Sequence, residues 1–216
     1  RGGRAGEWVL NHSRRKERPM SLLTQRPSAT PGTPPPPGPR GRPHPFTLGA
    51  VVMAIGASAF VHVNRSALPS PWATVALAAW IVAITLFCWA TFVRARHLPL
   101  TTPPHPRAGV VYVASTLAMV GVMAAGRWAL DEIGRPELQP AVVVVAVGLH
   151  FLPFAGAFRA PVFAVMGWVV AGIGFVGLLA GLVAGPEAVA AAAVVTGLVM
   201  LVVISIQALR HAGAAS

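Results

Sequence analysis

Residues 162–184 and 188–209 read VFAVMGWVVAGIGFVGLLAGLVA and AVAAAAVVTGLVMLVVISIQAL, and Gly185-Pro186-Glu187 joins them. Glu187 is the only charged residue between positions 162 and 209. Each run has the length of about 20 apolar residues that a helix needs to cross the hydrocarbon core of a bilayer. Because the connection is so short, the second helix must return beside the first. The stretch therefore predicts an antiparallel hairpin of two transmembrane helices.

Four earlier runs have the same apolar character, so the chain predicts an all-α bundle of six transmembrane helices over residues 46–209. Proline marks most of the boundaries, which suits a helix start because the missing N–H would have no partner there. The expected spans are 46–63, 72–93, 109–126 (with an extension to Ile133), 141–158, 162–184 and 188–209.

Composition supports a membrane protein. Of the 216 residues, 55% are hydrophobic and 11% are charged, and the mean hydropathy is +0.65. A soluble domain carries about 25% charged residues, so an ordinary water-soluble globule is excluded. Disorder over the whole length is excluded by the apolar content. The lipid bilayer is the expected partner.

The net charge of +11 does not indicate nucleic-acid binding. Nine of the 17 basic side chains fall in residues 1–45, and the others lie mostly beside apolar runs. That distribution is typical of topology determinants and membrane-surface anchors. The side of the membrane that carries the N-terminal tail would hold 14 Lys and Arg residues, and the opposite side would hold 3. We therefore expect both termini to be cytoplasmic, in the cell membrane.

Residues 1–45 predict a disordered, basic and proline-rich tail, since residues 27–45 contain nine prolines. A purine-rich codon run for Arg15-Lys16-Glu17 would precede Met20 as a ribosome-binding sequence, so one hypothesis starts translation at Met20, with residues 1–19 as a leader. The alternative is a genuine basic extension. Residues 210–216 predict a short cytoplasmic tail, and the abundance of Ala, Gly, Pro, Val and Arg suggests a GC-rich, bacterial gene.

His150 is the leading candidate for a functional residue. It lies about ten residues into the fourth span, ~15 Å deep, near the bilayer midplane. Pro153 should kink this helix, and Gly148 should let a neighbour come close. One interpretation is a proton relay or solute site. The other is a neutral imidazole that hydrogen-bonds a neighbouring helix; by depth, the partner would be Ser58, Ser115, Thr116 or Thr196.

A second candidate is a polar mouth at the outer ends of the first and third spans. Arg127 and Asp131 are four residues apart and should pair on one helix face. The alternative is a set of interfacial caps, since charges at helix ends reach the headgroups at little cost. The residues concerned are His62, Asn64, Arg65, Arg127, Trp128, Asp131 and Glu132.

Other features predict architecture rather than chemistry. Arg159, in a short turn, is expected to anchor the cytoplasmic side. Gly177, Gly181 and Gly185 recur every four residues and predict tight helix packing. Their partner is either the sixth span or another copy of the chain, which would make a homo-oligomer. No cofactor or metal site is expected, because no cluster of His, Cys and Glu surrounds His62 or His150. The sequence has one cysteine, Cys88.

At Gly148-Leu-His-Phe-Leu-Pro153, continuing to Phe158-Arg159, the chain resembles small uncharacterised bacterial multi-pass membrane proteins. These proteins carry a Gly-x-His-Phe-x-Pro element in a middle span, and the likeness covers about one span. The resemblance implies a helical bundle in the cytoplasmic membrane with no assigned activity.

The sequence therefore predicts a structural or accessory membrane protein, with a small-solute or proton-coupled transporter or channel using His150 as the alternative. An intramembrane enzyme is disfavoured, because no acidic residue lies in the core of any span.

Overall fold

The computed structural model describes residues 45–94 and 104–213, in which every regular element is helical. Six of the helices are long and apolar enough to span a membrane, so the chain is an all-α, multi-pass membrane protein. The six are α1 (Pro45–Asn64), α2 (Trp72–Cys88), α3 (Ala108–Glu132), α4 (Gln139–Ala157), α5 (Val162–Ala184) and α6 (Pro186–Gly213). Three short helices accompany them: the 3₁₀ turns η2 (Arg65–Ala67) and η4 (Pro136–Leu138), and the π-helical turn η3 (Trp89–Arg94).

Each predicted span overlaps one of the long helices, and the second, predicted over residues 72–93, is divided between α2 and the π-helical turn η3. The third helix takes the longer of the two predicted lengths, since α3 continues to Glu132. The last helix extends beyond the predicted end at Leu209, as far as Gly213, so part of the predicted C-terminal tail is helical. The predicted N-terminal tail, with its proposed start at Met20, lies outside the described residues.

Glycine ends two of the long helices where the backbone enters the left-handed region. Gly134 follows α3 with φ +68°, and Gly185 follows α5 with φ +85°. A residue without Cβ adopts this conformation at no steric cost, which is why glycine is favoured after a helix. Pro186 then begins α6 directly, so α5 and α6 form the predicted antiparallel hairpin.

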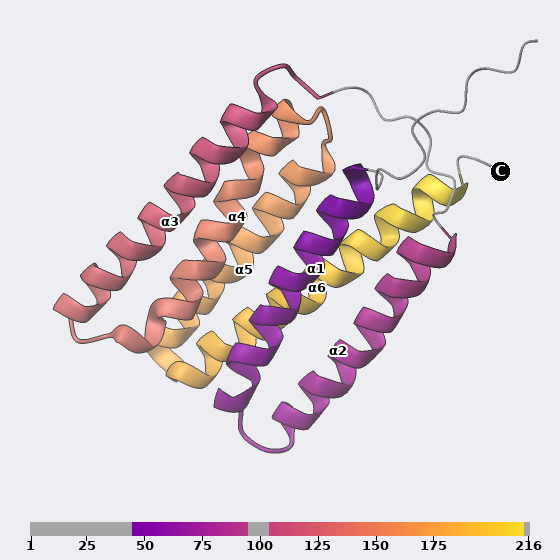
Figure 1. Cartoon of the computed structure of the whole chain (residues 1–216). Coiled ribbons are helices and arrows are strands. Elements are labelled where there is room, and N and C mark those ends of the chain that lie inside the picture. Colours follow the sequence, from indigo (N-terminus) through magenta and orange to yellow (C-terminus); the bar gives the residue numbers. More distant parts are fainter. Residues whose placement is uncertain (1–44, 95–103, 214–216) are drawn as a thin grey trace, which may run out of the picture. The chain divides into compact units, whose positions relative to one another are not determined.

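The helices of residues 45–213 form two groups of three (Figure 1). In one group, α4 lies between α3 and α5. In the other, α1, α2 and α6 pack against one another. The groups meet where α6 contacts both α5 and α4. Helix α3 is at one edge of the bundle, and among the long helices its main contact is with α4.

Helix α6 is the most enclosed element of the bundle. In its candidate span 56% of the residues are buried, compared with 11% in α3. Gly197 makes the contact with α1 very close, because a Cβ at this position would collide with the Ala57 carbonyl oxygen. Val61 of α1 and Leu201 of α6 are fully buried in the core. Close approach of backbones at small residues is the usual basis of helix packing in membranes.

The glycine stripe of α5 packs within the chain. A Cβ at Gly177 would lie 2.5 Å from the Ala192 side chain, and one at Gly181 would collide with Val189; both neighbours are on α6. The sequence left open whether these glycines meet the sixth span or another copy of the chain. In the structure Gly177 and Gly181 meet the sixth span.

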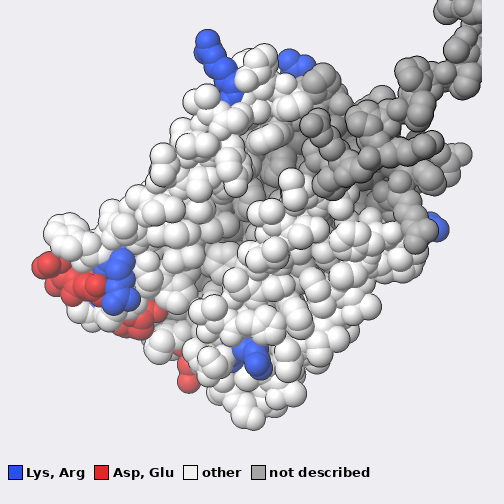
Figure 2. Space-filling view, viewed as in Figure 1, with Lys and Arg blue, Asp and Glu red and all other residues white. Residues whose placement is uncertain are grey.

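Charged side chains gather at the two ends of the bundle and leave an uncharged zone between them (Figure 2). We call the end that carries the α1–α2, α3–α4 and α5–α6 connections the acidic end. All acidic side chains of the described residues lie there: Asp131, Glu132, Glu137 and Glu187. Arg65, Arg127 and Arg135 share this end, and Arg94, Arg107, Arg159 and Arg210 lie at the opposite end. The arrangement matches a bundle whose middle is surrounded by lipid.

Candidate functional site

His150 of α4 is hydrogen-bonded to Ser115 of α3. The Ser115 Oγ lies 2.8 Å from His150 Nδ1 and 2.9 Å from the His150 carbonyl oxygen. Ser115 is buried, and the imidazole is half-buried. This contact links the edge helix α3 to the rest of the bundle, and it makes Ser115 the partner among the four that the depth count allowed.

The other three residues in that set are used elsewhere. Ser58 accepts a hydrogen bond from the Trp80 indole at 3.0 Å. Thr116 and Thr196 donate to carbonyl oxygens four residues earlier in their own helices. A hydroxyl that bonds its own helix is satisfied without a neighbour. Depth alone therefore could not separate Ser115 from the rest.

Aromatic rings surround the imidazole on α4. The ring of Phe154 lies edge-on to His150 with 4.6 Å between centroids, and that of Phe151 is 5.5 Å away. Phe163 of α5 stacks on Phe151 at 6.3 Å. Such pairs are favourable packing contacts in a core. His150 is therefore set among apolar rings on one side and a single hydroxyl on the other.

Two residues near His150 shape the backbone. A Cβ at Gly148 would collide with the backbone of Ala171 on α5, so this glycine permits the close approach predicted from the sequence. Pro153 lies inside α4, and its missing N–H leaves the Leu149 carbonyl without the usual helical donor. The adjacent carbonyl, that of His150, receives the Ser115 hydroxyl.

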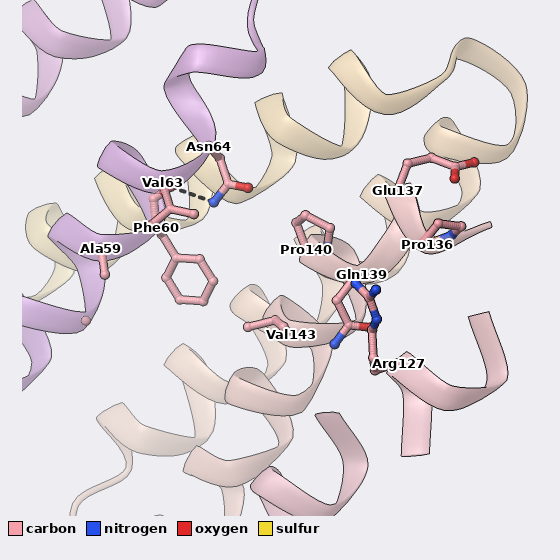
Figure 3. Close-up of a pocket in the computed structure, with 11 residues that line it drawn as sticks. Ala59, Phe60, Val63, Asn64, Arg127, Pro136, Glu137, Gln139, Pro140 and Val143 are labelled. Carbon is pink, nitrogen blue, oxygen red and sulfur yellow. Dashed lines mark hydrogen bonds between the residues drawn. The ribbon is translucent and has the colours of Figure 1, made fainter. Parts of the chain in front are cut away.

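A groove of about 550 Å³ opens between α1 and α4 at the acidic end (Figure 3). We call it the α1–α4 groove. Its α1 wall is one stripe of the helix, spaced by three and four residues: Gly56, Ala59, Phe60, Val63 and Asn64. Its other wall consists of Arg127 on α3, Pro136 and Glu137 on η4, and Gln139, Pro140 and Val143 on α4. The volume lies within the range of about 300–1,000 Å³ that small-molecule sites occupy.

The polar residues of the groove are held by neighbours. Arg127 Nε donates to Asp131 Oδ2 at 2.8 Å, as the sequence predicted. Glu137 is paired with Arg135, with 2.6 Å between Oε1 and Nε. Asn64 Nδ2 donates to the Phe60 carbonyl at 2.9 Å, and Figure 3 shows its oxygen pointing away from α1.

Gln139 has an oxygen without a partner. Its Nε2 donates to the Met123 carbonyl of α3 at 3.1 Å, which fixes the orientation of the amide, since only the nitrogen can donate. Its Oε1 is buried and has no hydrogen bond within the described residues. A buried acceptor without a donor costs about 1–3 kcal/mol, and its burial keeps Oε1 out of reach of a ligand in the groove.

The predicted polar mouth is brought together only in part. Arg127 and Asn64 line the same groove, with Asp131 behind Arg127. His62 does not, because its ring packs edge-on against Trp80 of α2 at 4.4 Å. Arg65 buries its Nε, for which the described part of the chain provides no hydrogen-bond partner, and Trp128 is exposed, as expected of an interfacial tryptophan.

Arg159 lies at the opposite end of the bundle from the groove. It follows α4 with φ +51°, a left-handed conformation that non-glycine residues rarely adopt. The Ala160 N–H bonds the Ala155 carbonyl at 3.1 Å and closes the helix end around it. An arginine here keeps a positive charge at a position that glycine would occupy more easily.

The sequence did not indicate Gln139 or Glu137 as site residues. Both precede or begin the fourth span, where polar residues are ordinary, and their role depends on α1 lying beside α4. Within the described residues, no three His, Cys, Asp or Glu side chains come close enough to hold a metal ion.

Comparison with known proteins identifies no relative. No family model, curated protein or solved structure matches this chain.

Proposed function

We propose that this chain is a structural or accessory protein of the bacterial cytoplasmic membrane. The observation that carries the proposal is the Ser115–His150 contact, which uses the one ionisable side chain in the middle of a span as a helix–helix hydrogen bond. An ionisable group used for transport would instead face a water-filled path.

The α1–α4 groove also supports the structural role. His150 and Ser115 are absent from its lining, which belongs to the half of the bundle near the acidic end. A transporter or channel that uses His150 would need a cavity reaching the imidazole. Phe151 and Phe154 pack against the ring, and Phe163 of α5 packs against these two phenylalanines.

We further propose that the acidic end faces outward and that both termini are cytoplasmic. Support comes from the excess of Lys and Arg on the tail side of the chain, 14 against 3, because positive residues accumulate on the cytoplasmic side. Labelling of single cysteines in intact cells tests this, in a Cys88→Ser background. A cysteine replacing Glu187 should react with an impermeant reagent, and one replacing the exposed His105 at the opposite end should not.

The structural role is tested by NMR of ring-labelled histidine in lipid, with His150→Ala to assign the signals. We expect the His150 ring signals to stay constant across about pH 5–8, the interval in which an accessible histidine titrates. A ring that titrates there would mean that water reaches it. The transporter alternative would then replace this proposal.

A further inference from the structure

The α1–α4 groove has the shape and the polarity gradient of a site for an amphiphile. Its stripe on α1 runs over nine residues from Gly56 to Asn64, a length of ~12 Å along the helix axis. The deep part is apolar, with Phe60 and Val143 on facing walls (Figure 3). The part at the end of the bundle is polar, with Arg127, Glu137 and Gln139. A membrane-embedded groove of this kind suits a chain at one end and a headgroup at the other.

Charges around the polar part balance. Arg127 pairs with Asp131, and Arg135 pairs with Glu137, so the four side chains carry no net charge. A headgroup with a net charge of either sign would gain little from such a set. A zwitterionic headgroup gains from the basic and the acidic side chains alike. Its phosphate is bound by a guanidinium, and its ammonium is bound by carboxylate or amide oxygens.

Hydrogen-bond acceptors in the polar part of the groove restrict the choice of headgroup further. The Asn64 nitrogen is engaged with its own helix, which leaves the Asn64 oxygen for the groove. An acceptor is satisfied by an N–H or an O–H donor. A primary ammonium offers three N–H donors, whereas a trimethylated ammonium offers none.

We propose that the α1–α4 groove binds phosphatidylethanolamine from the surrounding leaflet, with an acyl chain along the α1 stripe, the phosphate at Arg127, and the ammonium at the oxygens of Asn64 and Glu137. This binding site goes beyond the structural role proposed above and does not depend on the state of His150. It gives the protein a specific lipid partner at its acidic end.

Glycine in the groove wall provides a clean test. A Cβ at Gly56 meets no atom within 4 Å, so Gly56→Leu would fill the groove without displacing a neighbouring helix. Gly49 lies seven residues earlier on α1, equally unobstructed and outside the groove, so Gly49→Leu is the matched control. Ala59→Phe, at an exposed groove position, is a second blocking variant should Gly56→Leu fail to fold.

The experiment is native mass spectrometry of the full chain after exchange into vesicles that hold equal amounts of phosphatidylethanolamine, phosphatidylcholine and phosphatidylglycerol with the same acyl chains. We expect the wild-type protein to retain one phosphatidylethanolamine, at least about tenfold over either competitor, which corresponds to ~1.4 kcal/mol. Gly56→Leu or Ala59→Phe should lose this preference, and Gly49→Leu should keep it.

Three results would overturn the proposal. Equal retention of the three lipids by the wild-type protein would leave no headgroup selectivity. A preference for phosphatidylglycerol would contradict the ammonium assignment. Undiminished binding by a folded blocking variant would place the lipid elsewhere on the surface. None of these results alters the conclusion on His150, which the NMR measurement decides separately.

Discussion

Ser115 of α3 touches His150 of α4 at two atoms, with its Oγ 2.8 Å from Nδ1 and 2.9 Å from the carbonyl oxygen of the same residue. The serine hydroxyl has one hydrogen, and the carbonyl can only accept it. Ser115 therefore joins the edge helix α3 to α4 through both the side chain and the backbone of His150.

Ser115→Ala should weaken the attachment of α3. Interhelical hydrogen bonds of this kind contribute on average about 0.6 kcal/mol and at most ~1.7 kcal/mol, and we expect a loss within that range. The measurement is thermal or denaturant unfolding in lipid. Thr116→Val is the matched control, because the exposed Thr116 hydroxyl bonds only its own helix at the Tyr112 carbonyl. If the two variants lose equal stability, the contact does not hold α3.

The imidazole should be the Nδ1–H tautomer. Both contacts carry a hydrogen only when the Ser115 hydroxyl donates to the carbonyl and Nδ1–H donates to Oγ. Nitrogen chemical shifts of ring-labelled histidine in lipid distinguish the two tautomers. We expect the Ser115→Ala variant to lose the fixed tautomer. A wild-type ring protonated at Nε2 would show that the hydroxyl donates to the ring instead.

Gly148→Ala should destabilise the contact between α4 and α5. The added methyl would meet the backbone of Ala171, which cannot move aside as a flexible side chain can. Overpacking of this kind costs about 1–3 kcal/mol. Gly156→Ala on the same helix is the control, since its Cβ meets nothing within 4 Å. There we expect a gain of about 0.5–1 kcal/mol from the better helix propensity of alanine. Similar melting temperatures for the two variants would contradict the close approach.

Arg159→Gly should stabilise the fold while loosening its orientation. Glycine removes the cost of roughly 1–2 kcal/mol for a left-handed non-glycine residue. Part of this gain is lost, because glycine raises the conformational entropy of the unfolded chain. We therefore expect an increase of at most about 1 kcal/mol in the free energy of unfolding. Cysteine labelling in cells measures the fraction of inverted chains, which should rise because a cytoplasmic-side positive charge is lost. Arg159→Lys, which keeps the charge, should raise neither quantity.

Apolar length predicted the helices well, because a span needs a fixed number of apolar residues whatever its neighbours are. The extension of α3 to Glu132 was foreseen as an option, since Arg127 and Asp131 can pair on a helix end that leaves the hydrocarbon. The helix of residues 210–213 was not predicted, because apolar length indicates where a span ends and not where its helix ends.

The candidate site was predicted less completely, because it depends on which helices are neighbours. Gly148 indicated a close helix contact, and the expected depth in the membrane restricted the hydrogen-bond partner of His150 to four hydroxyl groups. Ser115 can be chosen among them only when α3 is known to lie beside α4. His62 was grouped with Arg127 from its depth alone. It faces Trp80 because α1 presents a different side to α2 than to the groove.

The enclosed position of α6 has a consequence for how the protein is made. Helices α1 and α2 are synthesised before the other four, yet their main contacts with the rest of the bundle are with α6, which is synthesised last of the six. The first pair must wait in the bilayer with its small-residue face uncovered until the last helix arrives. Assembly is therefore post-insertional, and during synthesis the unfinished chain presents to chaperones and membrane proteases the surface that Gly197 later covers.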